Sequence, residues 1–285
     1  MIGITGIGGI SAGGEFSHFQ SPLQLDLPVL AEYADLVDLP QSLAGVADKS
    51  GFKSHLKRRK AAKLFTPAAR MGLSAAAMAL GEAEDRQSIG LFVGVGREPP
   101  DEGEAEMALV CSERNGQLDP LALSGPGRDV YPPLLPLKTL PNMILAHISI
   151  HLDLMGCNGA WAGGPDAGVT ALLAAYWAVC EGRCEVALAG ASDSLIDLGQ
   201  ARDLLRQGIT TAPGEGAVFM RLERISDNRK TPWEMEWTGE QGAVDSLSEE
   251  IGYCGATDAL LHLAYVLSRG DTFCWRGLRF TKGLP

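Results

Sequence analysis

Apolar residues along the chain form two kinds of pattern: short continuous runs and longer stretches with helical spacing. A short continuous apolar run is typical of a strand that is buried on both faces. Such runs predict strands at Ile2–Gly6, Ile89–Gly96, Cys184–Ser194, Gly214–Ile225, Thr231–Glu240 and Thr272–Phe280. Apolar spacing and helix-forming residues predict helices at Pro67–Gly81, Asn142–Gly156, Pro165–Gly182 and Ala256–Gly270. This arrangement of strands and helices predicts an α/β fold.

No feature of the sequence divides the chain into separate domains. Residues 97–140 are rich in proline and glycine and contain the acidic run Asp101–Glu106, so we interpret them as a long excursion from the body of the fold. The rest shows no low-complexity segment and no change of composition. We therefore predict a single domain over residues 1–285.

Composition and charge restrict the classes of partner. Apolar residues make up 46% of the chain and charged residues 21%, as in folded globular proteins. The formal net charge of −11 disfavours nucleic acid and anionic membranes as partners. No apolar run approaches the ~18 residues of a membrane span, and Met1–Ile10 lacks the basic residues of a signal peptide. We expect a cytoplasmic protein.

The stretch from Gly156 to Gly182 has the pattern of a strand, a glycine turn and a helix. Gly163 and Gly164 permit a sharp turn, and Pro165 suits the first position of a helix because its missing N–H would be unpaired there. Many α/β enzymes hold a nucleophile at such a junction. Residues 163–169 nevertheless contain no serine, cysteine or threonine. The sequence thus predicts a nucleophile elbow without a nucleophile; we call residues 163–168 the elbow.

Other candidate sites carry weaker signals. The glycines from Gly6 to Gly14 resemble a dinucleotide fingerprint, but Ser11 interrupts it, so a glycine-rich turn is the better interpretation and no cofactor is predicted. His147 and His151 have a spacing that can bind zinc, yet no third ligand is evident. The six cysteines are scattered without a CxxC pair, and we expect free thiols and no metal. Ser192–Ser194 ends a predicted strand, where either a functional or a capping role is open.

A basic cluster stands out in this acidic chain: Lys57, Arg58, Arg59 and Lys60. A run of this kind is usually a solvated face of the protein. It can also dock an acidic partner.

Several of these segments, in their order along the chain, resemble the β-ketoacyl–acyl-carrier-protein synthases of the thiolase superfamily. The resemblance covers roughly residues 1–225. It rests on the opening strand and turn, the segment that carries the elbow, the strand after the elbow helix, and the strand that ends the family's first half. These segments are Ile2–Gly14, Leu140–Gly168, Cys184–Ser194 and Gly214–Glu223.

The resemblance places the family's nucleophilic cysteine on Pro165. It also places the family's asparagine on Asn158 and the glycine after the nucleophile on Gly168. Cys157 falls on a proline of the family pattern, several residues before the turn, and does not replace the nucleophile. The resemblance therefore implies an inherited elbow whose chemistry is lost.

The second half of the family pattern is strongly shortened in this chain. Residues 225–252 contain no His-Gly-Thr motif. The segment after them resembles the family's later motif, with Tyr253 in place of the second histidine and Ser248 in place of a lysine. His262 lies off the motif, and we predict that it packs in the core. The resemblance thus implies a thiolase-like fold with a nearly complete first half, residues 1–225, and a shortened second half, residues 226–285.

A ketosynthase homologue without catalytic residues implies a non-catalytic subunit, similar to the chain-length factors of bacterial type II polyketide and aryl-polyene-like systems. Its partner would be a catalytic ketosynthase, and an acyl carrier protein would dock indirectly. In the family, the strand before the elbow pairs with its twin across the dimer axis, which places Cys157–Ala162 at an interface. Trp161 and Met143 are then candidates for residues that line the acyl tunnel; alternatively, both only pack in the hydrophobic core of this subunit. The basic cluster is the candidate for carrier docking.

Two alternatives stay open from the sequence. One is an independent acyltransferase or hydrolase with relocated groups such as Ser192, His147 or Asp166. The other is a homodimeric acyl-binding protein. The enzyme alternative lacks a nucleophile and base in one sequence context.

Overall fold

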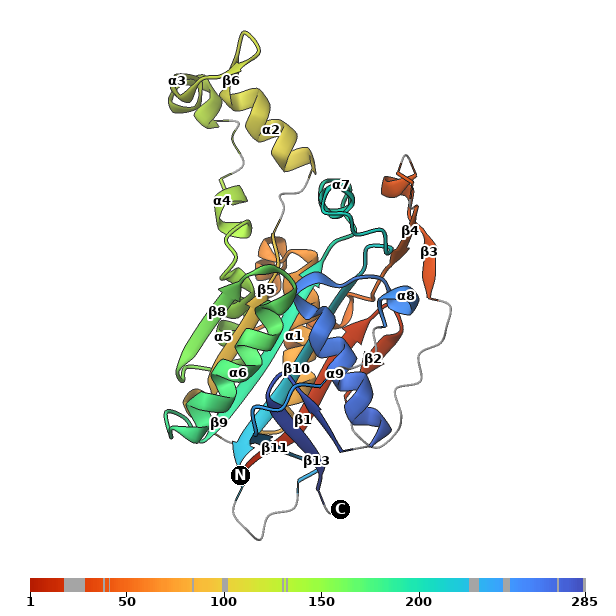
Figure 1. The fold of residues 1–285 in the computed structure, drawn as a ribbon. Helices are drawn as coiled ribbons and strands as arrows, with labels where there is room; N and C mark the ends of the chain where they lie inside the picture. The colour runs from red at the N-terminus through yellow and green to blue at the C-terminus, as the bar shows by residue number, and fades with distance from the viewer. Residues whose placement is uncertain are drawn as a thin grey trace.

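The computed structural model describes residues 1–17, 29–37, 39–40, 42–83, 85–98, 102–129, 131, 133–225, 231–242, 247–270 and 272–283. The statements on structure below concern these residues. A large mixed sheet forms the centre of the fold, with helices on both faces (Figure 1). Both ends of the chain lie at the same end of the molecule (Figure 1).

The strands of the main sheet follow the order β12-β13-β11-β1-β10-β9-β5-β8, with β2 beside β1. Their bounds are β1 Ile2–Ser11, β2 Gly14–Phe16, β5 Gly90–Val95, β8 Asn158–Ala162, β9 Val186–Ser194, β10 Glu215–Arg224, β11 Trp233–Trp237, β12 Phe273–Trp275 and β13 Leu278–Lys282. Strand β5 runs parallel to both β8 and β9, whereas the other pairs are antiparallel. Outside this sheet, β3 (Leu30–Glu32) pairs with β4 (Leu43–Gly45) and β6 (Glu113–Arg114) with β7 (Gln117–Leu118).

The α-helices are α1 Pro67–Leu80, α2 Glu102–Ser112, α3 Pro120–Ser124, α4 Leu135–Lys138, α5 Met143–Leu152, α6 Ala167–Cys180, α7 Leu198–Arg206, α8 Ser248–Ile251 and α9 Asp258–Arg269. The 3₁₀ turns are η1 Ala34–Leu36, η2 Gly51–His55, η3 Arg59–Leu64, η4 Arg86–Ser88, η5 Pro126–Asp129, η6 Gly164–Asp166 and η7 Gly255–Thr257. No helix among the described residues is long and apolar enough to span a membrane.

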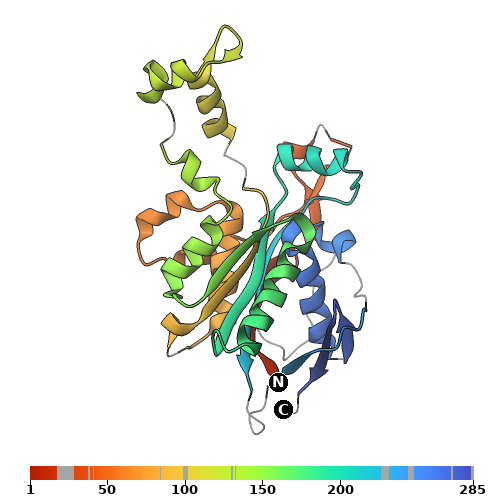
Figure 2. The same cartoon turned by 60° about the vertical axis from the view of Figure 1, so that its left-hand side comes forward.

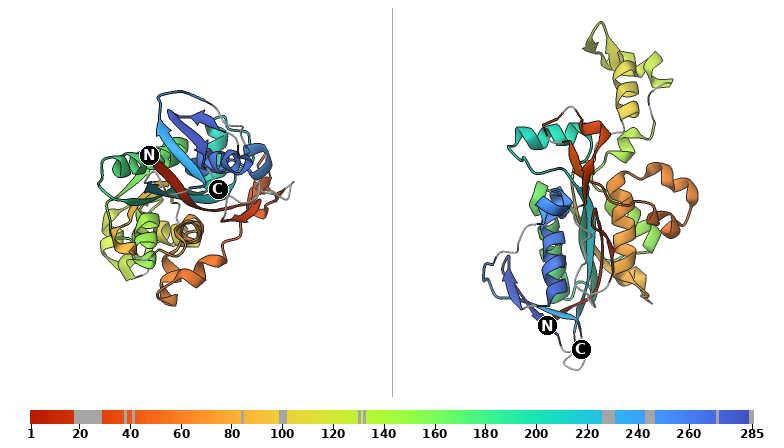
Figure 3. Two further views of the ribbon diagram at one scale, coloured as in Figure 1. Left: turned by 90° about the horizontal axis from the view of Figure 1, so that it is seen from below. Right: turned by 90° about the vertical axis from the view of Figure 1, so that its right-hand side faces the viewer.

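Helices α1 and α5 cover one face of the sheet, and α6 and α9 cover the other (Figure 3). Strand β5 shows why both faces are buried. Leu91, Val93 and Val95 point into the core with α1 and α5, and Phe92 points into the core with α6 and α9. A continuous apolar run is what a strand between two helical layers requires.

The first strand is longer than the sequence predicted. Residues 7–11, expected to turn, continue the strand to Ser11. A Cβ atom on Gly6 would lie 2.2 Å from the carbonyl oxygen of Ala79, and one on Gly8 would lie 2.3 Å from that of Ala75. Gly6 and Gly8 therefore allow α1 to pack directly on the strand, and the predicted turn is confined to Ala12 and Gly13, between β1 and β2.

Helix α1 begins where the sequence predicted. The Thr66 hydroxyl accepts a hydrogen bond from the Ala69 amide at 3.2 Å, and Pro67 occupies the start of the helix. Both features are typical of a helix N-terminus.

The segment after residue 225 adds β11, β13 and β12 to the edge of the sheet beside β1, and it adds α9 to one face. Thr272–Phe280 was predicted as one strand, but it forms the hairpin of β12 and β13. Arg276 and Gly277 make the turn with φ angles of 50° and 86°. Two adjacent left-handed residues are the geometry of a tight hairpin turn.

The excursion between β5 and α5 forms an arm that projects from one end of the body (Figure 2). It contains α2, β6, β7, α3 and α4. Large apolar side chains on the arm are exposed: Met107, Leu109, Val110, Leu118 and Leu121. The sequence predicted the excursion but not these elements.

Candidate functional site

The elbow lies between the edge strand β8 and helix α6. Gly164 has a φ angle of 68°, which is strained for any residue with a side chain. Pro165 is exposed in the 3₁₀ turn η6, and α6 starts two residues later, at Ala167. The predicted strand, turn and helix are thus present, but Pro165 stands one short turn before the α-helix that it was expected to open.

Close backbone approach explains two glycines, Gly168 in the elbow and Gly94 in the neighbouring strand β5. A Cβ atom on Gly168 would lie 2.6 Å from the carbonyl oxygen of Ala256. A Cβ atom on Gly94 would lie 2.4 Å from the Gly168 amide nitrogen. Glycine at both positions lets β5, α6 and η7 meet, so the first turn of α6 lies directly against the sheet.

A cavity of about 500 Å³ opens beside the elbow. Its described lining consists of Pro165, Asp166, Gln241, Gly242, Asp258, Ala259, His262, Trp275 and Arg276. None of these residues has a hydroxyl, thiol or amine side chain that could accept an acyl group. The elbow and the segment after residue 225 thus border a polar space whose described walls carry no hydroxyl, thiol or amine nucleophile.

Asp258 is the centre of a buried group of polar atoms at the start of α9. Its carboxylate accepts hydrogen bonds from the Ser248 hydroxyl at 3.1 Å and from the Cys254 amide at 3.0 Å. The other carboxylate oxygen lies 3.4 Å from His262 Nε2. Burial lowers the pKa of His262, although the charges of Asp258 and Glu250 oppose the shift. The imidazole is therefore neutral at pH 7.

His262 is buried, as the sequence predicted, but it also lines the elbow cavity. Sequence reasoning did not identify the Asp258–His262 pair. The signal was present, because residues four apart on a helix share one face. It was missed because His262 was considered alone.

Tyr253 lies close to the elbow. Burial raises its pKa to about 12, and the charges of Asp258, Asp193 and Asp166 contribute. The Tyr253 amide donates to the Ala212 carbonyl at 2.7 Å, which fixes the backbone beside β10. The phenol is thus a neutral hydrogen-bonding group at pH 7.

The groups proposed for a relocated active site are occupied elsewhere. The Ser192 hydroxyl is fully buried and donates to the Ala68 carbonyl at 2.7 Å. His147 Nε2 lies 3.3 Å from the Leu64 carbonyl, and its ring stacks on Phe65 at 3.9 Å between centroids. Burial lowers the pKa of His147 to about 4. Asp166 is across the sheet on the elbow, so the structure does not bring these three groups together.

The predicted zinc pair has a structural explanation. His151 Nδ1 accepts a hydrogen bond from the Lys57 amide at 3.1 Å, while His147 faces the Leu64 carbonyl. Both imidazoles therefore anchor residues 57–64 on α5. Within the described ranges, no group of three His, Cys, Asp or Glu side chains is placed to hold a metal ion.

Strand β8 forms one edge of the main sheet. It pairs with β5 and, among the described residues, with no strand on its other side. Its side chains are small apart from Asn158 and Trp161, and it carries no charge or proline. Lysine, proline and bulges are the usual protection of an exposed edge. Strand β8 has none of them.

Trp161 is half-buried and folds back over its own strand. Its ring stacks on Phe92 with centroids 6.1 Å apart, and it covers Gly159. It packs on the core that α6 and α9 share, whereas the buried side of α5 belongs to the other core. Met143 is the half-buried first residue of α5. Cys157 is half-buried just before β8, and Asn158 is exposed on it.

The basic cluster lies on the same face of the sheet as α1 and α5, opposite α9 (Figure 3). All four side chains are exposed. Lys57 forms an ion pair with Asp153, and no ion pair is found for Arg58, Arg59 or Lys60 within the described structure. These three charges are available to an acidic partner.

The comparisons place this geometry in a family. A model of the β-ketoacyl synthase N-terminal domain matches residues 31–222, more than half of the chain. The chain belongs to the β-ketoacyl synthase family. A search of curated proteins finds no match.

Solved structures show the same fold. The structure of the ishigamide ketosynthase/chain length factor has a TM-score of 0.62 at 18% identity, and the match covers 98% of this chain and 97% of that one. A ketosynthase from module 6 of the bacillaene synthase of Bacillus subtilis 168 has a TM-score of 0.64 at 12% identity, covering 95% of this chain but 61% of that one. A β-ketoacyl synthase from Burkholderia phymatum STM815 has a TM-score of 0.60 at 14% identity, covering 94% and 86%. The predicted thiolase-like α/β fold is confirmed.

Proposed function

We propose that this chain is a non-catalytic subunit of a ketosynthase complex, in the manner of a chain-length factor. The observation that carries the proposal is the elbow itself. Its turn, its glycine contacts and its helix are built, but Pro165 stands at the position where the family resemblance puts the nucleophile. No described residue of the adjoining cavity offers a hydroxyl, thiol or amine to an acyl group. One solved structure of similar fold has chain length factor in its name.

The partner in this proposal is a catalytic ketosynthase. Strand β8 supports it, because its unprotected edge offers backbone hydrogen bonds that a strand of the partner can complete. Met155 and Ile150 lie in the segment that leads into β8 and are 73% and 59% exposed, so large apolar side chains remain uncovered there. Exposed apolar surface favours a protein interface.

The role in this proposal is to shape the acyl tunnel of the complex, and Trp161 is the candidate wall residue. Carrier docking falls mainly on the catalytic subunit, since a chain with a net charge of −11 repels an acidic carrier protein. The basic cluster then makes a secondary contribution. The single domain over residues 1–285, with a shortened second half, is part of the same proposal.

Intact-protein mass spectrometry tests the proposal most directly. The purified chain, with and without a co-expressed ketosynthase from its genomic neighbourhood, is incubated with acyl and malonyl thioesters. We expect an acyl adduct on the ketosynthase and none on this chain, with no release of carbon dioxide by this chain alone. A stoichiometric adduct on any residue of this chain contradicts the proposal.

A hydrolase is the second candidate function, and the Asp258–His262 pair is the observation that favours it. A neutral imidazole beside a carboxylate can take a proton from water in the 500 Å³ cavity. Release of free acid from an acyl thioester, lost in His262→Gln, would support this function. Unchanged background hydrolysis in both proteins would exclude it.

A further inference from the structure

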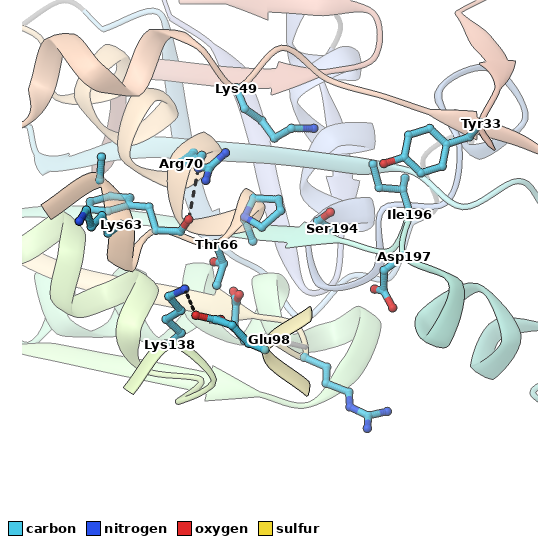
Figure 4. Close-up of a pocket in the computed structure, with 16 residues that line it drawn as sticks. Tyr33, Lys49, Lys63, Thr66, Arg70, Glu98, Lys138, Ser194, Ile196 and Asp197 are labelled. Atoms are coloured by element: carbon cyan, nitrogen blue, oxygen red, sulfur yellow. Dashed lines mark hydrogen bonds and ion pairs between the residues drawn. The ribbon is translucent and has the colours of Figure 1, made fainter. Parts of the chain in front are cut away.

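The two ends of strand β5 have different surroundings. Its carboxyl end opens into a cavity of about 420 Å³ beside β9 and the start of α1, with the ion pair of Lys138 and Glu104 in its wall (Figure 4). Its amino end lies beside two cysteines, Cys157 just before β8 and Cys184 shortly before β9. Because β5 lies between β8 and β9 in the sheet, the two cysteines approach one strand from either side.

The two cysteine side chains meet over Gly90, the first residue of β5. The parallel register pairs Leu91 with Asn158. One position earlier, Cys157 is therefore opposite Gly90, and its side chain points to the same face of the sheet. Both cysteines pack in the core that α6 and α9 share, and a Cβ atom on Gly90 would lie 3.0 Å from Cys184 Sγ. Glycine at this position leaves the space in which the Cys157 and Cys184 thiols are hydrogen-bonded neighbours.

The two thiols differ in their access to solvent. Cys157 is half-buried, whereas Cys184 is only 7% exposed. Burial raises the pKa of Cys184 to about 12, and the neighbouring Cys157 contributes to the shift. An oxidant from solution therefore reaches Cys157 first, and Cys184 is the thiol that can attack the oxidised sulfur from within the protein.

We propose that Cys157 and Cys184 form a reversible disulfide when the chain meets a small disulfide such as glutathione disulfide. The Cys157 thiolate attacks one sulfur of the reagent, whose S–S bond breaks; a mixed disulfide forms and one glutathione thiolate leaves. The Cys184 thiol then loses its proton, its sulfur attacks that of Cys157, and the second glutathione leaves as the thiol. Two electrons pass from the protein thiols to the reagent, and excess reduced thiol reverses both steps.

The cross-link closes a loop of 28 residues, from Cys157 to Cys184. This loop contains β8, the elbow and α6. A disulfide restricts the unfolded chain and so stabilises the segment that it closes. Oxidation thereby holds the edge strand and the elbow against β5 and β9. This chemistry is independent of the role proposed above for the elbow and β8.

Oxidation of the full-length chain tests the pair, in a background with Cys180→Ser and Cys274→Ser. Of the four cysteines that remain, Cys157 is half-buried and the other three are buried. The folded protein is incubated with glutathione disulfide at pH 8, and the reaction is stopped with N-ethylmaleimide in denaturant before intact-mass measurement and peptide mapping.

We expect the alkylated thiols to fall from four to two, with no glutathione retained and one peptide that joins Cys157 to Cys184. Dithiothreitol should restore all four thiols. Four free thiols after oxidation, a stable glutathione adduct on Cys157, or a cross-link between any other pair overturns the proposal.

Two further variants separate the roles of the thiols. Cys184→Ala should retain one glutathione on Cys157, because no second thiol is left to displace it. Cys157→Ser should form neither the cross-link nor an adduct, because Cys184 is buried. Cys111→Ser is the matched control, since it removes a buried thiol on α2 and should keep the cross-link. An adduct on Cys184 in Cys157→Ser, or none on Cys157 in Cys184→Ala, overturns the proposal.

Urea unfolding of the oxidised and reduced forms tests whether the folded state accommodates the bridge. We expect a higher midpoint in the oxidised form that returns to the reduced value on addition of dithiothreitol. A lower midpoint in the oxidised form would mean that the bridge forms only with distortion of the fold, and overturns the proposal.

Discussion

The guanidinium of Arg276 lies 3.0 Å from the carboxylate of Asp166, so the turn of the β12–β13 hairpin is tied to the elbow. Asp166 occupies the N-cap position of α6 but makes no side-chain capping bond there. Its carboxylate points across the cavity to a residue 110 positions later in the chain.

Arg276 also holds a left-handed backbone conformation, with a φ of 50°. Both side chains of the ion pair are about half exposed, so the pair itself contributes little to stability. We therefore predict that Arg276→Gly leaves the free energy of unfolding nearly unchanged, because glycine relieves the backbone strain. Arg276→Ala, which keeps the strain and loses the pair, should be less stable than Arg276→Gly by about 1 kcal/mol. Urea denaturation of both variants measures the difference, and equal stability would show that the turn is unstrained.

Gly168 should be the least replaceable glycine of the elbow. Its Cβ atom in Gly168→Ala would lie 2.6 Å from a backbone oxygen of η7, and backbone cannot move aside as a flexible side chain can. We expect a loss of about 1–3 kcal/mol in the free energy of unfolding. Gly163→Ala is the matched control, because no atom lies within 4 Å of its added Cβ. If the two variants are equally stable, the close packing of α6 on η7 is absent.

Glu98 should make stability depend on pH. Burial raises its pKa from 4.5 to about 7, with a smaller contribution from the charge of Asp193. The folded state therefore keeps a proton that the unfolded state has released between pH 4.5 and 7. The contribution of Glu98 to the free energy of unfolding is greatest below pH 4.5 and falls as the pH rises through 7, by up to about 3 kcal/mol.

Glu98→Gln removes this dependence and keeps the shape of the side chain. Its stability relative to the wild type should increase from pH 5 to pH 8, as measured by urea unfolding at each pH. Asp193, whose burial raises its pKa to about 7, is present in both proteins and enters the comparison only through its charge interaction with Glu98. A difference that is constant with pH would mean that Glu98 is ionised in the folded state at pH 5.

The basic cluster should matter less than its charge density suggests. Replacing both Arg58 and Arg59 by Glu should reduce turnover of the complex by about two- to threefold at low salt, because the catalytic subunit does most of the carrier docking. The effect should disappear near 0.15 M salt, where charges more than ~8 Å apart are screened. Arg183→Glu with Arg206→Glu is the control for the same change of net charge outside the basic cluster; these two arginines are ion-paired, with Glu181 and Asp203. An abolished reaction at physiological salt would show that this subunit provides the main docking surface for the acyl carrier protein.

The sequence predicted the elements whose pattern is local. Strand β5, helix α1 and the strand, turn and helix of the elbow follow from apolar runs and from residues such as Thr66 and Gly164. Gly6 and Gly8 of β1 were misread because their role is to let α1 approach, and the α1 residues that they contact, Ala79 and Ala75, lie 73 and 67 positions later in the sequence. The Asp166–Arg276 pair and the cavity between β5, β9 and α1 join segments that no local pattern connects. They could be found only once the chain was folded.

Trp161 is the residue on which the proposed tunnel depends most. It is half-buried on an edge strand and stacks on Phe92, so one side of the indole is held by this chain. If its other side meets the partner, Trp161→Ala should leave the complex assembled and lengthen or blur the product distribution. If the ring is plain core or interface, the variant should lose roughly 3–5 kcal/mol of stability or association without a change of product length.

Product profiling beside size-exclusion chromatography of the Trp161→Ala complex separates these outcomes. Trp177→Ala is the matched control, because Trp177 is a partly exposed indole on α6 that contacts Trp237, away from β8. We expect the product distribution to change in Trp161→Ala and to stay the same in Trp177→Ala. The tunnel role requires this contrast, because loss of a large aromatic side chain alone would affect both variants through stability. An intact Trp161→Ala complex that makes unchanged products would exclude the tunnel role and leave Trp161 as packing.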